Sequence, residues 1–105
     1  MKLEELILKV EEWAEARNLI KGATVEKQWL KLDEEKGELA AGIARGDKEK
    51  TVDGLGDTLV VLIILAKQLG ITFDEALGVA YEEIKDRKGK MINGIFVKEA
   101  DLKAE

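Results

Sequence analysis

The sequence contains no cysteine and no histidine. These absences exclude disulfides, thiolate nucleophiles, zinc sites of the Cys/His type and acid–base catalysis by imidazole. A di-iron carboxylate bundle is also disfavoured, because its usual Glu-x-x-His ligands require histidine. Any metal bound by this chain must therefore have oxygen ligands, which suit hard cations, chiefly Mg²⁺ or Mn²⁺, or Ca²⁺.

Proline is absent as well, and aromatic residues make up only 5% of the sequence. Both features favour helices over sheets. With 46% apolar and 37% charged residues, the composition is that of a folded protein. The 105 residues suffice for one domain and are too few for two. We therefore expect a single all-α domain over residues 1–105, with a core of about residues 3–88 and a C-terminal tail of residues 89–105.

Basic residues are fewer than acidic residues, 17 against 22, so the formal net charge is −5. This balance argues against a nucleic acid polymer as a partner. The N-terminus lacks the basic region, apolar core and small-residue cleavage site of a secretion signal. The apolar run LVVLIILA, residues 59–66, is far shorter than the ~20 residues that a membrane span needs, and it is better interpreted as a buried helix. We expect a cytoplasmic protein without a membrane partner.

Apolar residues recur at helical spacing in four segments, which predicts helices over residues 3–17, 25–45, 48–69 and from Thr72 onward. Polar residues that favour helix starts and glycines that favour helix ends mark their limits: Thr24, Gly46, Asp47, Gly70, and Thr72 with Glu75 as a capping box. The prediction is an antiparallel four-helix bundle-like domain, with the third helix the most enclosed.

The fourth predicted helix has a clear apolar stripe, which we expect to face the core. Its members are Phe73, Ala76, Leu77, Ala80 and Ile84. The segment that follows is interrupted by glycine and is expected to pack partly as an extended tail.

Acidic residues border the apolar stripe of the second helix in the stretch KLDEEKGEL, residues 31–39. At about 100° per residue, Glu35 and Glu38 lie about 60° and 120° from Leu32, whereas Asp33 and Glu34 look like ordinary surface charge. Asp53 and Asp57 share one face of the third helix in the same way. A partly buried cluster of these acids requires a compensating charge, for which a divalent cation is a natural candidate. The alternative is that each pair belongs to an ordinary solvated helix face.

KLDEEKGEL followed by VDGLGDTLVVLIILA resembles the MazG-like branch of the all-α nucleoside triphosphate pyrophosphohydrolases. That family has Glu-x-x-Glu on one helix and Glu-x-x-Asp on the next. Glu35 and Glu38 match the first pair and Asp57 matches the final acid, while Gly54 stands where the family has its other Glu and Asp53 precedes it by one residue. The resemblance extends from about residue 13 to residue 101 and includes RKGKMINGIFVKEAD.

The resemblance implies Mg²⁺-dependent cleavage of a nucleoside triphosphate between the α and β phosphates, giving the monophosphate and pyrophosphate. It implies metal ligation by Glu35, Glu38 and Asp57. Asp53, four residues before Asp57 and on the same face, could take over the role of the missing Glu. Either Glu35 or Glu38 could then accept a proton from the attacking water. It also implies nucleotide-pool house-cleaning and assembly into a homodimer or homotetramer.

Candidate substrate-binding residues accompany the acids. Lys31 lies on the carboxylate side of the second helix, and Arg87 and Lys90 offer a second basic group, although favourable interaction with a helix C-terminus is an alternative for them. Trp13 is a candidate for stacking on a base, with core packing as its alternative. Gln28 is either a base or sugar contact or a buried contact between helices, and Asn93 joins the set only through the resemblance.

Two other functions remain open from the sequence. A noncatalytic nucleotide- or metal-binding module that has lost turnover is the alternative that Gly54 raises. A purely structural helical interaction protein, with solvated acids, is the second.

Overall fold

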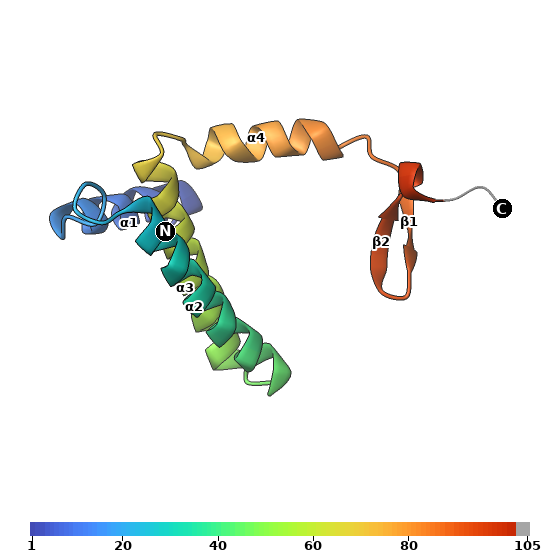
Figure 1. Cartoon of the computed structure of the whole chain (residues 1–105), viewed down its shortest axis with the longest axis horizontal. Coiled ribbons are helices and arrows are strands. Elements are labelled where there is room, and N and C mark those ends of the chain that lie inside the picture. The colour runs from blue at the N-terminus through green and yellow to red at the C-terminus, as the bar shows by residue number, and fades with distance from the viewer. Residues whose placement is uncertain (103–105) are drawn as a thin grey trace. The chain divides into compact units, whose positions relative to one another are not determined.

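The computed structural model describes residues 1–102 of the chain and divides it into two compact units, Met1–Phe73 and a second unit that begins at Asp74. The first unit contains α1 (Leu3–Ala16), α2 (Val25–Ala44) and α3 (Lys48–Gln68). After α4 (Phe73–Ile84), the second unit contains β1 (Gly89–Ile92), β2 (Ile95–Lys98) and the short 3-10 helix η1 (Glu99–Asp101) (Figure 1). The predicted all-α class with four helices is confirmed, with one small two-stranded sheet added to it.

Two of the residues that the sequence marks as helix starts, Thr24 and Asp47, cap their helices. The Thr24 hydroxyl accepts a hydrogen bond from the Lys27 N–H at 3.1 Å, and the Asp47 carboxylate accepts one from the Lys50 N–H at 3.1 Å. Gly46 lies between α2 and α3 and has φ 64°. Residues other than glycine rarely adopt this left-handed backbone conformation. This short turn makes α2 and α3 an antiparallel pair.

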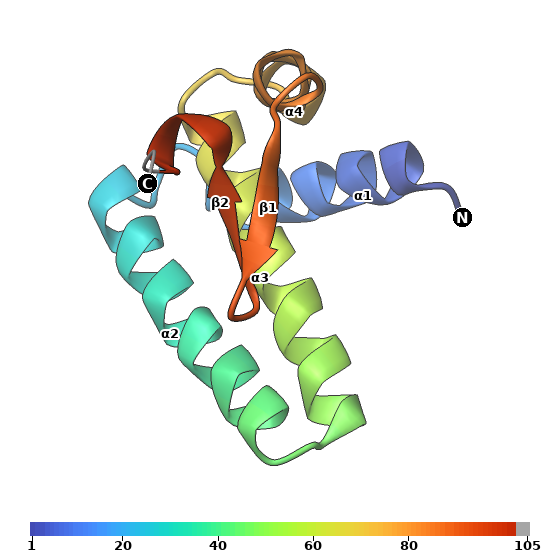
Figure 2. The same ribbon diagram turned by 90° about the vertical axis from the view of Figure 1, so that its right-hand side faces the viewer.

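The α2–α3 pair forms the core of the first unit. Leu32 packs with Val61 and Leu65, and Val25 and Leu62 surround this cluster. Figures 1 and 2 both show α2 and α3 side by side, with α1 crossing α3. The prediction that the third helix is the most enclosed is confirmed, since α3 has more buried residues than any other helix of the described chain.

One side chain of α3, Gln68, forms hydrogen bonds to the backbone of the connection between α1 and α2. The Gln68 amide nitrogen donates to the carbonyl of Ala23 at 2.9 Å, and it lies 3.4 Å from the carbonyl oxygens of Leu19 and Ile20. These bonds satisfy backbone acceptors that lie outside any helix. They fix the end of α1 against the C-terminal end of α3.

The second unit contains a β-hairpin that corrects the predicted extended tail. β1 pairs with β2 in antiparallel register, with Ile92 opposite Ile95. The two residues between them, Asn93 and Gly94, have φ of 51° and 80°. Positive φ at both central residues is the requirement of a type I′ turn, for which Asn-Gly is the strongest sequence signal. The tail is extended as predicted but folds back on itself, and the Asn-Gly pair could have revealed this.

The apolar stripe of α4 is not buried by the residues of its own unit. Leu77 is 71% exposed and Ile84 is 50% exposed, so the second unit by itself leaves the predicted inward face uncovered. Among residues 1–102, no single helix is both long and apolar enough to cross a membrane, and only α3 and α4 taken together as a broken pair satisfy length and composition.

Candidate functional site

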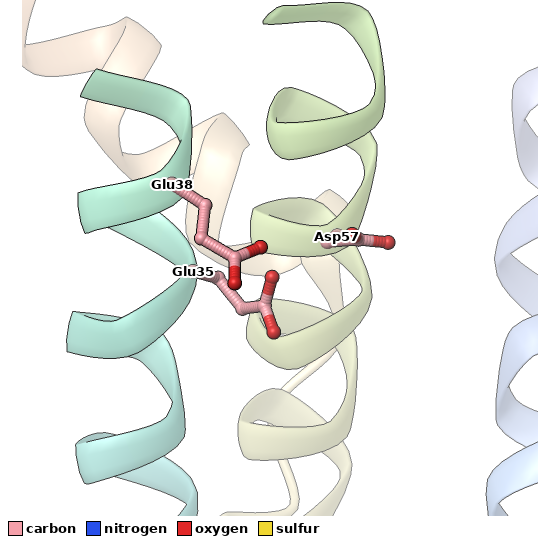
Figure 3. Close-up of side chains that lie close together, drawn as sticks. All are labelled: Glu35, Glu38 and Asp57. Atoms are coloured by element: carbon pink, nitrogen blue, oxygen red, sulfur yellow. The ribbon is translucent and has the colours of Figure 1, made fainter. Parts of the chain in front are cut away.

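Three carboxylates from two helices come together in the first unit. Glu35 and Glu38 are three residues apart on α2, so they project from one side of that helix. Asp57 lies on the neighbouring helix α3 (Figure 3). One carboxylate oxygen from each of the three residues lies within 4.8 Å of the others. The structure therefore brings together three of the four acids that the sequence suggests as metal ligands.

Glu35 is the buried member of this cluster, with only 8% of the residue exposed. Its Oε1 lies 3.3 Å from the Lys31 ammonium, which also lies 3.5 Å from Glu34. The other oxygen, Oε2, is buried and has no hydrogen-bond partner in the described chain. A buried carboxylate oxygen without a donor is costly. This oxygen is an available ligand atom that a cation would satisfy.

The electrostatics of the cluster favour a cation. The pKa of Asp57 is raised above its ordinary value, first by burial and then by the negative charges of Asp53 and Glu35. The pKa of Lys31 is raised as well, because Glu35 hydrogen-bonds its ammonium and Glu34 and Glu35 attract its charge. Lys31 thus compensates part of the negative charge of the cluster, and burial together with the acids Asp53 and Glu35 still raises the pKa of Asp57.

These residues fit a divalent metal ion. All donors are carboxylate oxygens, one of them is buried without a partner, and the three can reach a common point. Hard cations such as Mg²⁺ prefer oxygen ligands of this kind and often keep several waters beside one or two carboxylates. The cluster is thus a suitable divalent-cation site, with Glu35, Glu38 and Asp57 as the ligands.

Asp53, the fourth predicted ligand, is exposed and does not belong to the three-residue cluster. It lies one turn before Asp57 on α3, close enough for its charge to raise the pKa of Asp57. Its influence on the site in this structure is electrostatic.

Gly54 has a packing function that the sequence does not reveal. It is buried, and a Cβ atom at this position would lie 2.8 Å from the Cα of Leu39 on α2. No real Cβ approaches backbone so closely, so a larger residue would push the two helices apart. Gly54 therefore allows the close approach of α2 and α3.

Gln28 and Lys31 lie on the same helix as the two glutamates. Gln28 is buried at 9% exposure, four residues before Leu32 of the core cluster. Lys31 is one turn before Glu35, and its side chain is 49% exposed. Both of the roles suggested for Gln28 are compatible with this position. Lys31 forms an ion pair with Glu35 and is still accessible from solvent.

Trp13 borders a cleft between α1 and α3. The cleft has a volume of about 420 Å³ and is lined by Leu6, Lys9, Val10, Trp13, Asp57 and Val60. Trp13 is 45% exposed, so its ring is accessible from the cleft and also packs beside apolar residues of α1 and α3. The Arg17 guanidinium lies 4.6 Å from the centre of its ring and donates to the Trp13 carbonyl at 3.2 Å.

Lys9 is a residue of this cleft that the sequence analysis missed. It lies one position before Val10 and four before Trp13, beside the apolar stripe of α1. Its spacing from Trp13 was a usable signal, but nothing in the sequence indicates that α1 crosses α3 next to Asp57. Only the packing of the two helices places this lysine and the acid in one cleft.

The remaining predicted substrate-binding residues belong to the second unit. Arg87 follows α4 and lies 3.8 Å from Glu83 of that helix. Lys90 is on β1, opposite Val97. Asn93 occupies the hairpin turn, where its positive φ already explains an asparagine. For each of these three residues, a role at the substrate remains a prediction.

The fold and the cluster define a class: helical proteins whose candidate metal site is built from carboxylates on two antiparallel helices. Within that class the chain belongs to the MazG family, because residues 23–92 match the MazG nucleotide pyrophosphohydrolase domain. This confirms the resemblance. The chain is also 48% identical, over 66 residues, to an uncharacterized 18.2 kDa protein in the rep-hol intergenic region of Haemophilus phage HP1 (strain HP1c1).

That match covers 63% of this chain, and it spans only 40% of the length of the phage protein. No solved structure matches the chain significantly. The family match covers α2, α3, α4 and β1 but not α1, which precedes residue 23.

Proposed function

We propose that this protein is a divalent-cation-dependent nucleoside triphosphate pyrophosphohydrolase. It converts an NTP or dNTP to the monophosphate and pyrophosphate. The observation that carries the proposal is the cluster of Glu35, Glu38 and Asp57, which lies within the residues matched to the MazG nucleotide pyrophosphohydrolase domain.

Mg²⁺, or Mn²⁺, held by Glu35, Glu38 and Asp57 would supply neutralisation of the triphosphate charge and acidification of a water molecule. Glu38 is exposed and has no ion pair in the part of the chain that the structure describes, so it is free to accept a proton. Glu35 is buried and held by Lys31, which suits it to ligation. Of the two candidate bases, we therefore favour Glu38.

In the reaction, the water oxygen attacks the α-phosphorus and Glu38 accepts the proton of that water. The bond between the α-phosphorus and the oxygen that bridges to the β-phosphorus breaks, and pyrophosphate leaves with that oxygen. The exposed ammonium of Lys31 is close enough to the cluster to contact a phosphate oxygen.

We further propose that the chain acts as a cytoplasmic homodimer or homotetramer in nucleotide-pool house-cleaning. The apolar stripe of α4, which the second unit by itself leaves uncovered, supports self-association, since exposed apolar patches of this kind mark interaction sites. The net charge of −5 favours neither a nucleic acid polymer nor an anionic membrane surface as a partner.

The test is to incubate the full chain with individual NTPs and dNTPs and Mg²⁺, and to measure pyrophosphate separately from phosphate. We expect pyrophosphate from at least one nucleotide and none when the metal is chelated. No pyrophosphate from any nucleotide, with metal binding demonstrated by calorimetry, would reject the enzyme. That outcome would favour the noncatalytic nucleotide- or metal-binding module, for which Gly54 in place of the family's Glu is the supporting observation. In the same assay, full activity of Asp53→Asn would mean that three carboxylates suffice.

A further inference from the structure

Asp57 belongs to two features of the first unit. It is one of the three carboxylates of the acid cluster, and it lines the cleft between α1 and α3. Figure 3 shows Glu35 and Glu38 reaching from α2 toward α3, which carries Asp57. The acid cluster and the cleft are therefore contiguous. A molecule whose phosphates lie at the cluster can extend its other end into the cleft.

The cleft has the properties of a small-molecule site. Its volume of about 420 Å³ lies within the range of roughly 300–1,000 Å³ that is typical for such sites. Its wall is apolar except for Lys9 and Asp57, and it includes the half-exposed ring of Trp13. An aromatic ring held in place can stack on a planar base at little entropic cost. Here the Arg17 guanidinium against the Trp13 ring limits the freedom of that ring.

Lys9 is the cation of this cleft. It forms no ion pair within residues 1–102, whereas Lys31, on the other side of the cluster, is already shared by Glu34 and Glu35. An acidic protein that binds a polyanion needs a cation next to its carboxylates. Lys9 lies in the same cleft as Asp57, and its ammonium can donate to phosphate oxygens without first breaking an ion pair.

We propose that the α1–α3 cleft is the nucleoside pocket of this protein, and that Lys9 binds a phosphate of the nucleotide whose base stacks on Trp13. The proposal rests on the proposed function for the identity of the ligand. It adds a wall of the site from α1, which lies outside the residues matched to the family. Lys9 and Trp13 lie outside the matched residues, so the family match does not account for them.

The test measures binding, so it does not depend on turnover. In a Trp29→Phe background Trp13 is the sole tryptophan, and its fluorescence is titrated with the α,β-methylene analogues of ATP, GTP, CTP and UTP and with the corresponding nucleosides, each with Mg²⁺. We expect at least one analogue to quench Trp13. Lys9→Gln should raise the Kd of that analogue by about tenfold and leave the Kd of the nucleoside unchanged. Lys9→Arg should retain most of the affinity.

Lys48→Gln, which removes an exposed lysine at the start of α3, is the matched control and should not change either Kd. Lys9→Glu is the second variant and should weaken the analogue further than Lys9→Gln does, with circular dichroism showing that each variant is folded. An unchanged Kd in both Lys9 variants would overturn the role of Lys9. Binding of an analogue without any change in Trp13 fluorescence would overturn the pocket, as would the absence of binding by every analogue.

Failure of this inference and failure of the proposed function give different results. If the wild-type chain releases pyrophosphate and Lys9→Gln has the same KM, the function stands and the inference is rejected. If the wild-type chain releases none but the binding pattern above is found, the inference stands and the enzyme is rejected.

Discussion

At the scale of single residues, the three carboxylates of the acid cluster repel one another. Three negative charges within 4.8 Å disfavour one another when no cation is bound, and Lys31 contacts only one of the three. Repulsion of this kind reduces stability without metal and increases affinity for a cation. Stability and activity should therefore respond in opposite directions when a charge is removed from the cluster.

Glu38→Gln tests whether stability and activity respond in opposite directions. The variant removes a ligand and the proposed base, so we expect pyrophosphate release to fall by about 10²-fold or more. In metal-free buffer the same variant should unfold at the same or a higher temperature than the wild type, because it relieves repulsion. Asp33→Asn is a suitable control, since Asp33 is on the same helix but its side chain is 54% exposed and pairs with Lys36. Retained turnover in Glu38→Gln would show that the site is misplaced.

Asp57 should make stability depend on pH. Its folded-state pKa is raised above the ordinary 3.8, so the folded chain holds this proton more strongly than the unfolded chain does. In metal-free buffer the contribution of Asp57 to the free energy of unfolding therefore decreases as pH rises from 3.8 through the raised pKa.

Asp57→Asn removes the group that causes this decrease in the free energy of unfolding. We expect the variant to be more stable than the wild type at neutral pH, with the difference disappearing as pH falls toward 3.8. Urea denaturation with a chelator at several pH values measures this, and a difference independent of pH would contradict it. With metal present the order should reverse, because the wild type alone has the ligand.

At the scale of the helices, the site depends on how closely α2 approaches α3. Gly54 meets the backbone of Leu39, and Gly42 meets the backbone of Thr51, where an added Cβ would lie 2.9 Å from the Thr51 nitrogen. These two glycines allow the close packing that brings Glu35, Glu38 and Asp57 together. The helices themselves follow from apolar spacing and caps, but their separation follows from these contacts.

Gly54→Ala and Gly56→Ala form a matched pair on α3. The first places a methyl group against the α2 backbone and should lower the free energy of unfolding by about 1–3 kcal/mol. The second meets nothing within 4 Å and should raise it by roughly 0.5–1 kcal/mol, because alanine favours a helix more than glycine does. Chemical denaturation compares the two. Equal effects of the same sign would mean that Gly54 does not hold the helices close.

On the scale of the whole molecule, the second unit has apolar surface that its own residues leave uncovered. Leu77, Tyr81 and Ile84, which share one side of α4, are 71%, 59% and 50% exposed. An amphipathic helix gains most of its stability by burying its apolar side against a partner. A second copy of the chain is the partner that we propose.

Leu77→Lys should therefore shift the chain toward the monomer, as measured by sedimentation velocity across a range of concentrations. A charge in an apolar contact is costly, and Leu77 lies on the proposed face. Asp86→Asn, just beyond α4, is an exposed control that should leave the distribution unchanged. If the wild type is itself monomeric at all concentrations, the assembly proposal is wrong.

The sequence alone determined the helices and the chemistry of the site. Four helices follow from apolar spacing and local caps, which act over a few residues, and the absence of Cys and His restricts any metal to oxygen ligands. Glu35, Glu38 and Asp57 could be selected because helical periodicity places them beside an apolar stripe. The Asn93-Gly94 pair also indicates the hairpin turn, although we predicted only an extended tail.

Tertiary structure decided what depends on distances between helices. It separated Asp53 from the three-residue cluster, left Glu35 Oε2 buried without a partner, and showed Gly54 against the α2 backbone. It also placed Lys9 in one cleft with Asp57, although 48 positions separate them in the sequence. Periodicity gives the face on which a side chain lies but not the crossing of one helix over another, and the crossing of α1 over α3 is what forms the proposed nucleoside pocket.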